Sequence, residues 1–132
     1  MNTLQHIQLN VSNFKKSFEF YKDFLSEFNY KIIISHDFYA GFSNETVDLW
    51  LIQTEENHLD KKFHRKATGL NHLAFKVSSK EEVDNFAKDF LKKRKIPTLY
   101  NTPKPFPEYN KDYYAVFFED PDRLKLEVVY FG

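Results

Sequence analysis

Two histidines and one glutamate stand where they could bind a metal ion together. The segments Leu4–Ser12 and Leu70–Ser78 align without a gap, and the alignment pairs His6 with His72 at an offset of 66 residues (72 − 6). Glu127 stands in an alternating segment near the end of the sequence. Two imidazoles and one carboxylate on one side of a divalent cation form a facial triad, whose open positions let a substrate bind the metal directly. We therefore take His6, His72 and Glu127 as candidate metal ligands.

The repeat is the reason to prefer ligands over ordinary histidines. A single histidine on a strand is more often a polar residue satisfied by its neighbours than a metal ligand. Here the same offset also pairs residues downstream, Phe20 with Phe86, Asp23 with Asp89, Phe24 with Phe90 and Leu25 with Leu91. The sequence thus predicts one domain over residues 1–132, made of a module 1–55, a linker 56–68 and a second module 69–132.

Each module has the pattern of a strand, a helix and three further strands. The opening strands alternate apolar and polar residues, and the helices repeat large apolar residues at helical spacing. The later strands are expected at 30–35, 38–42 and 47–53 in the first module, and at 97–101, 113–118 and 124–130 in the second. The predicted fold class is α+β, with tandem βαβββ modules that form one curved mixed sheet around a cup, helices outside.

Strand alternation predicts which side chains face the cup. The residues on the inward face include His6, His72, Lys76, Lys125 and Glu127. In the first module, either Trp50 or Asp48 matches the place of Glu127, depending on register. Trp50 there would leave three protein ligands and an aromatic wall, whereas Asp48 there would be a fourth ligand.

The residues expected to bind substrate come from both modules, and they are Trp50, Lys76, Tyr109 and Tyr114. The segment 101–110 holds three prolines and cannot form an interior strand or a helix. It is either a rim over the cup or a stiff surface connection. Its Tyr109, with Tyr113 and Tyr114 beyond it, either presents a phenol to substrate or simply packs.

Composition excludes several classes of function. With 19 Lys and Arg against 19 Asp and Glu, the net charge is zero, which argues against nucleic acid or a membrane surface as partner. The sequence has no cysteine and no glycine-rich phosphate loop. No apolar stretch is long enough for a membrane span, and no signal peptide is visible, so we expect a cytoplasmic protein. Exposed sheet edges predict a homodimer, and the cup closes either within one chain or across that dimer.

The opening motifs Leu-x-His-Ile-x-Leu-x-Val and Leu-Asn-His-Leu-Ala-Phe-x-Val, with Phe-Phe-Glu-Asp-Pro-Asp-Arg-Leu-Lys-Leu-Glu near the end, resemble the vicinal oxygen chelate superfamily. That superfamily includes glyoxalase I, extradiol dioxygenases, and fosfomycin and bleomycin resistance proteins. The resemblance implies a divalent metal (Fe, Mn, Ni, Zn or similar) at His6, His72 and Glu127. It also implies a small oxygen-rich substrate that chelates this metal.

The resemblance leaves the reaction open between lyase or isomerase, dioxygenase and fosfomycin-type thiol transferase chemistry. Trp50 in place of a first-module carboxylate would remove the base that glyoxalase I uses, whereas fosfomycin thiol transferases share the segment Asp48–Leu51. Extradiol dioxygenases add an acid-base histidine that has no match here. The alternative function is a binding protein of the bleomycin-resistance type, which sequesters a small molecule without turnover.

Overall fold

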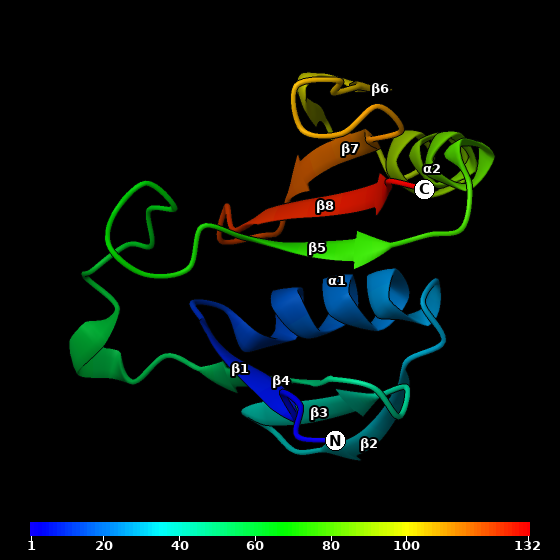
Figure 1. Ribbon diagram of the computed structural model, residues 1–132. Coiled ribbons are helices and arrows are strands. Elements are labelled where there is room, and N and C mark those ends of the chain that lie inside the picture. The colour runs from blue at the N-terminus through cyan, green and yellow to red at the C-terminus, as the bar shows by residue number, and fades with distance from the viewer. The chain divides into compact units, whose positions relative to one another are not determined.

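The computed structural model describes all 132 residues and divides into two compact units, Met1–Lys62 and Phe63–Gly132 (Figure 1). The division falls inside the segment 56–68 that was expected to link the modules, and the short 3-10 helix η1 (Glu56–His58) lies in the same segment. Both units have the element order β-α-β-β-β. The predicted α+β class and the tandem βαβββ modules are confirmed. No helix is long and apolar enough to cross a bilayer.

The first unit is a four-stranded mixed sheet with one helix on it. The strands run in the order β1-β4-β3-β2, with β1 parallel to β4 and the other neighbours antiparallel. The elements are β1 (His6–Val11), α1 (Phe14–Ser26), β2 (Lys31–Ser35), β3 (Tyr39–Ser43) and β4 (Asp48–Gln53).

Helix α1 begins where the sequence supplies a cap. The side chain of Asn13 accepts a hydrogen bond from the backbone N–H of Lys16 and so satisfies one of the free donors of the first turn. The helix then buries one face, formed by Tyr21, Phe24 and Leu25. Alternate residues of β4 and β3 are buried with it, namely Leu49, Leu51 and Phe42. The opposite face of this sheet therefore carries Asp48 and Trp50.

The second unit repeats this plan in a sheet of order β5-β8-β7-β6, with β5 parallel to β8. Its elements are β5 (His72–Lys76), α2 (Lys80–Phe86), η2 (Ala87–Lys92), β6 (Thr98–Pro105), β7 (Tyr114–Glu119) and β8 (Lys125–Tyr130). Phe86 of α2 packs on Phe118 of β7, with ring centroids 5.5 Å apart. The helix thus covers the face that also buries Leu126 and Val128.

The second helix begins as the α-helix α2 and continues after Phe86 as a π-helix. Ser79 caps α2 by accepting a hydrogen bond from the N–H of Glu82, whose carboxylate accepts one from the N–H of Ser78. After Phe86 the chain continues as the π-helix η2, where an uninterrupted α-helix would be the simpler expectation. Phe90 and Leu91 are consecutive in η2 and both are buried.

Strand β6 is longer than the sequence predicted, because it continues from the expected end at Asn101 through to Pro105. It lies at the edge of the sheet, with β7 on one side only, so its prolines need not supply hydrogen bonds to a second neighbour. Its register with β7 shifts between Leu99 and Lys104. The prolines are therefore compatible with an irregular edge strand, although they would not be compatible with an interior strand.

Candidate functional site

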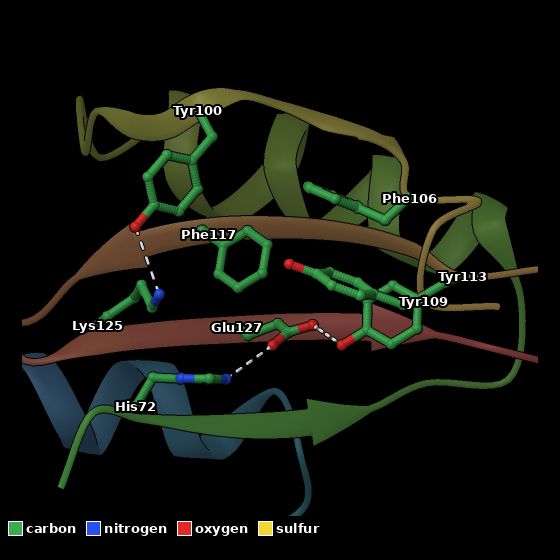
Figure 2. A pocket seen from close by; sticks show the side chains of 8 residues that line it. All are labelled: His72, Tyr100, Phe106, Tyr109, Tyr113, Phe117, Lys125 and Glu127. Carbon is green, nitrogen blue, oxygen red and sulfur yellow. Dashed lines mark hydrogen bonds and ion pairs between the residues drawn. The ribbon is translucent and has the colours of Figure 1, made fainter.

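The face of the second sheet that lies away from α2 carries a cavity of about 460 Å³. Its lining includes two residues of β8, Lys125 and Glu127, which point away from the buried Leu126 between them. The full lining is His72, Tyr100, Phe106, Tyr109, Tyr113, Phe117, Lys125 and Glu127, drawn in Figure 2. This volume is in the range of sites that hold a small ligand.

Glu127 is the most buried charged group of the cavity. Its side chain is 1% exposed, and its two oxygens have different partners. The hydroxyl of Tyr113 donates a hydrogen bond to Oε2, and Nε2 of His72 lies 3.2 Å from Oε1 (Figure 2). A carboxylate buried to this extent requires such partners, because the cost of removing it from water is high.

The orientation of the His72 ring follows from its neighbour Asn71. Nδ1 of His72 lies 2.6 Å from the side-chain oxygen of Asn71, while the amide nitrogen of Asn71 donates to the carbonyl of Arg65 at 3.3 Å. Because the amide nitrogen is occupied in this way, the oxygen is the atom that faces the ring. Nδ1 of His72 therefore carries the proton, and in the neutral ring Nε2 presents a lone pair toward Glu127.

The lone pairs of His72 Nε2 and Glu127 Oε1 face each other across 3.2 Å, and they repel each other unless a positive charge lies between them. That charge is either a proton on the imidazole or a metal ion. An imidazole nitrogen and a carboxylate oxygen are common ligands of Zn, Fe, Mn and Ni. The second interaction of each ligand, Asn71 on His72 and Tyr113 on Glu127, is the type of support that metal ligands receive in proteins. The residues present thus fit a divalent metal ion.

His6 of the first unit is held in the same manner. Its Nδ1 lies 2.5 Å from the side-chain oxygen of Gln5, and the amide nitrogen of Gln5 donates to Asp48 at 2.8 Å. The amide again turns its oxygen to the ring, so Nε2 of His6 is left as the free lone pair. Gln5 and Asn71 occupy equivalent positions of the repeat. Both candidate histidines can therefore bind a metal ion through Nε2.

The strand register identifies the first-unit position that matches Glu127. Gln8 of β1 pairs with Trp50, and Ala74 of β5 pairs with Glu127. Gln8 and Ala74 are themselves equivalent in the repeat, so Trp50 occupies the place of Glu127. The Trp50 indole lies across Gly41, where an added Cβ would come within 2.8 Å of the ring. An aromatic side chain thus stands where the second unit has its buried acid.

Asp48 occupies the place of Lys125. It pairs with His6 in the ladder, as Lys125 pairs with His72. Hydrogen bonds from Ser43 and Gln5 lower the pKa of Asp48, with Ser43 the larger cause. Its role in this structure is to hold the Gln5 amide, and a role as a fourth metal ligand stays a prediction.

The structure brings together part of the predicted site. His72, Glu127 and Tyr109 line one cavity of the second unit, whereas His6, Asp48 and Trp50 belong to the first unit. No group of three His, Asp or Glu side chains that could hold a metal is found in either unit. The complete ligand set His6, His72 and Glu127 therefore stays a prediction.

Three of the four predicted substrate-binding residues lie outside the cavity lining, namely Trp50 of the first unit, Lys76 and Tyr114. Nζ of Lys76 lies 4.6 Å from the ring centroid of Phe131. Tyr114 donates its hydroxyl to Asp84 of α2 at 2.6 Å, on the helix side of the sheet. Burial, followed by this hydrogen bond, raises the pKa of Tyr114 to about 12.

The preceding residue, Tyr113, was also a candidate to present its phenol, and it does line the cavity. Burial, and then the hydrogen bond to Glu127, raises the pKa of Tyr113 well above its usual value. The phenol therefore stays protonated and continues to donate to the carboxylate at neutral pH. Sequence reasoning missed the other aromatic members of the lining, Tyr100, Phe106 and Phe117, although it placed Lys125 on this face.

Comparison with known proteins identifies the family. The family model described as Glyoxalase/Bleomycin resistance protein/Dioxygenase superfamily matches residues 3–128. The chain belongs to this superfamily. Proteins similar in sequence include YqjT of Bacillus subtilis (strain 168), which is 36% identical over 126 residues, 96% of this chain and 97% of that protein. The metallothiol transferase FosB of Staphylococcus haemolyticus is 27% identical over 125 residues, 95% of this chain and 81% of that protein.

Several solved structures show the same fold. A candidate glyoxalase from Bacillus halodurans has a TM-score of 0.87 and 39% identity, over 96% of this chain and 93% of that chain. Lactoylglutathione lyase from Agrobacterium tumefaciens has a TM-score of 0.68 at 20% identity, over 98% of this chain and 93% of that chain. The second likeness concerns the fold alone.

Proposed function

We propose that this protein is a divalent-metal-dependent enzyme of the glyoxalase superfamily that acts on a small oxygen-rich molecule. His72 and Glu127 of the second unit bind the metal, and His6 completes the set, from the same chain or from a second copy. The proposal rests on one observation, which is that both histidines make the same side-chain hydrogen bond with the residue before them. Gln5 and Asn71 each accept from Nδ1 of the following histidine, which leaves both Nε2 atoms free to bind a cation.

A metal bound there would act as a Lewis acid toward substrate oxygens. The remaining tasks fall to residues of the chain. Tyr113 holds the carboxylate of Glu127 in one orientation through its hydrogen bond. The rings of Phe106, Tyr109 and Phe117 exclude water from one side of the cavity and offer flat surfaces to an apolar part of the substrate.

Thiol transfer is the reaction that we propose to test first. A tryptophan in place of a first-unit carboxylate leaves no base there for proton abstraction, which isomerisation requires. The similarity to the metallothiol transferase FosB extends over 95% of this chain. Dioxygenase and isomerase chemistry are the next two reactions to test.

The test compares three assays on protein loaded separately with Mn²⁺, Ni²⁺, Zn²⁺ or Fe²⁺. These follow thiol consumption with fosfomycin and cysteine, oxygen uptake with catechol, and isomerisation of the hemithioacetal of methylglyoxal. We expect one activity that disappears with chelator and in His72→Ala. His58→Ala is the matched control, because His58 is exposed in η1 and should retain the activity. Activity that survives both chelation and His72→Ala would contradict the proposal.

A binding protein without turnover is the second candidate. The aromatic character of the cavity favours it, because five of the eight lining residues are Tyr or Phe. Such a protein would bind aromatic antibiotics tightly and stoichiometrically, with no product in any of the three assays. It would also bind them equally well after chelation.

We further propose that the protein is a homodimer. Strand β2 is an edge strand of the first sheet, and Ile32, Ile33 and Ile34 on it are exposed. An apolar edge of this kind tends to pair with another chain. Light scattering that gives twice the mass of 15.9 kDa would support a dimer, and the mass of a single chain would contradict it.

A further inference from the structure

Lys125 is a cation inside the cavity that no carboxylate neutralises. It forms no ion pair, and its ammonium group has one polar partner, the hydroxyl of Tyr100 at 3.3 Å (Figure 2). Its Nζ also lies 5.3 Å from the ring centroids of Tyr100 and of Phe117. Cation–π contacts stabilise the charge but use none of the N–H donors along the direction of a hydrogen bond. Donors of Lys125 are thus left for a ligand.

The acids nearest to Lys125 along the sheet already have other partners. Glu119 is its partner in the β7–β8 ladder, but the carboxylate of Glu119 binds Arg65 and Arg123. Glu127 lies two residues along the same strand, and its oxygens face the hydroxyl of Tyr113 and Nε2 of His72. Neither acid forms an ion pair with the ammonium group of Lys125.

Tyr100 lies in a stretch of strained backbone that is held by hydrogen bonds to its surroundings. Tyr100 and Asn101 have φ values of 61° and 57°, which non-glycine residues rarely adopt. The buried Thr102 hydroxyl secures this irregular stretch, because it donates to the carbonyl of Leu99 and accepts from the N–H of Phe117. Strained backbone held by its surroundings is typical of binding sites. Here it sets the Tyr100 hydroxyl beside Lys125.

The first unit of the repeat carries no cation at this place. The equivalent residue of the first unit is Asp48, of opposite charge, in the same ladder position beside a histidine. The second unit differs by a free ammonium group at the end of an aromatic cavity. In Figure 2, Lys125 and Tyr100 lie at one end of this cavity, and Tyr109 and Tyr113 lie toward the other.

From this arrangement we propose that the substrate is a small organic acid with a flat apolar body, whose carboxylate binds to Lys125 and Tyr100. The body of the acid packs on Phe117 and the neighbouring rings. The inference deepens the proposed function, because the same substrate would offer its other oxygens to the metal at His72 and Glu127. The acid group itself does not depend on that metal.

Benzoate and benzamide are suitable probes, because they share a flat ring and differ in charge. Calorimetry on metal-free protein should show that benzoate binds about tenfold or more tightly than benzamide, as expected for hydrogen bonds to a charged group. Lys125→Gln should remove this preference and Lys125→Arg should keep it. Lys88→Gln, an equal charge change at an exposed site in η2, should leave it unchanged.

Equal binding of the two probes by the wild-type protein would overturn the inference. A benzoate preference that persists in Lys125→Gln would overturn it as well, because another group would then bind the acid. The proposed metal site fails separately, through loss of metal uptake by the wild-type protein. A preference for benzoate in protein that binds no metal would keep the acid site and refute the metal-dependent function.

Discussion

The support of His72 by Asn71 can be tested by the substitution Asn71→Ala. The side-chain oxygen of Asn71 lies 2.6 Å from Nδ1 of His72 and fixes both the tautomer and the orientation of the ring. Loss of such a partner typically lowers metal affinity by about 10- to 100-fold, or roughly 1.4 to 2.8 kcal/mol. Because Asn71 is exposed, its truncation leaves no cavity, and the stability of the fold should change by less than about 0.5 kcal/mol.

The measurement has two parts. Competition with a fluorescent chelator for Zn²⁺ gives the metal affinity, and urea unfolding of the metal-free protein gives the stability. Asn85→Ala is the control, because Asn85 is an exposed asparagine of α2 and should bind metal like the wild type. If Asn71→Ala bound Zn²⁺ as tightly as the wild type, the argument from the His72 tautomer would be refuted.

The same reasoning applies to Gln5 in the first unit. Gln5→Ala removes the oxygen that lies 2.5 Å from Nδ1 of His6 and should lower metal affinity by a similar factor. Equal losses in Gln5→Ala and Asn71→Ala would support a metal ion bound by both histidines. A loss in Asn71→Ala alone would exclude His6 from the ligand set.

Three further predictions concern stability. Gly41→Ala should cost about 1 to 3 kcal/mol in urea unfolding, because its Cβ would lie 2.8 Å from the Trp50 ring; no loss would show that the indole moves freely. Thr102→Val should cost about 1 to 3 kcal/mol, because a buried N–H loses its acceptor, and Thr102→Ser should recover most of it. The pKa of Tyr114 is raised to about 12 in the fold from an unfolded value of about 10, so its contribution is complete below pH 10 and lost as the pH rises toward 12. Unfolding at pH 9 and 11.5 should show a smaller loss in Tyr114→Phe than in the wild type, and equal losses would contradict the assignment.

The sequence predicted the fold well because the signals were local and repeated. The alternation in the two opening strands, the helical spacing of Phe20 and Phe24, and the constant offset all survive in the structure. The β-α-β-β-β order follows from these signals alone. The exposed polar face of β1 and the inward position of Lys125 were likewise set by alternation.

The site was harder to predict because it depends on pairing between strands. The sequence could not choose between Asp48 and Trp50, since both lie on the same face and only the ladder with β1 decides. Both Tyr113 and Tyr114 were candidates to present a phenol to substrate, and only Tyr113 lines the cavity, because adjacent residues of an extended chain face opposite sides of the sheet. Tyr113 immediately precedes β7, and the residues that follow Tyr114 in β7 are apolar on both faces, so alternation carries no signal there.

Tyr100 could not have been found from the sequence pattern. Its place in the cavity arises from the positive φ values of Tyr100 and Asn101 and from the register shift in β6. Both residues are of types that usually take ordinary backbone conformations, asparagine less strictly than tyrosine. The contacts that hold the stretch run through Thr102 to another strand, which the local sequence does not reveal.

The central claim is that two histidines and one glutamate bind a single metal ion. Elemental analysis of protein purified without chelator tests it most directly, with circular dichroism to establish that each variant is folded. We expect about one metal ion per chain in the wild type, and loss of that ion in His6→Ala, His72→Ala and Glu127→Gln, each with the fold retained. Folded variants that keep the full metal content of the wild type would contradict the claim.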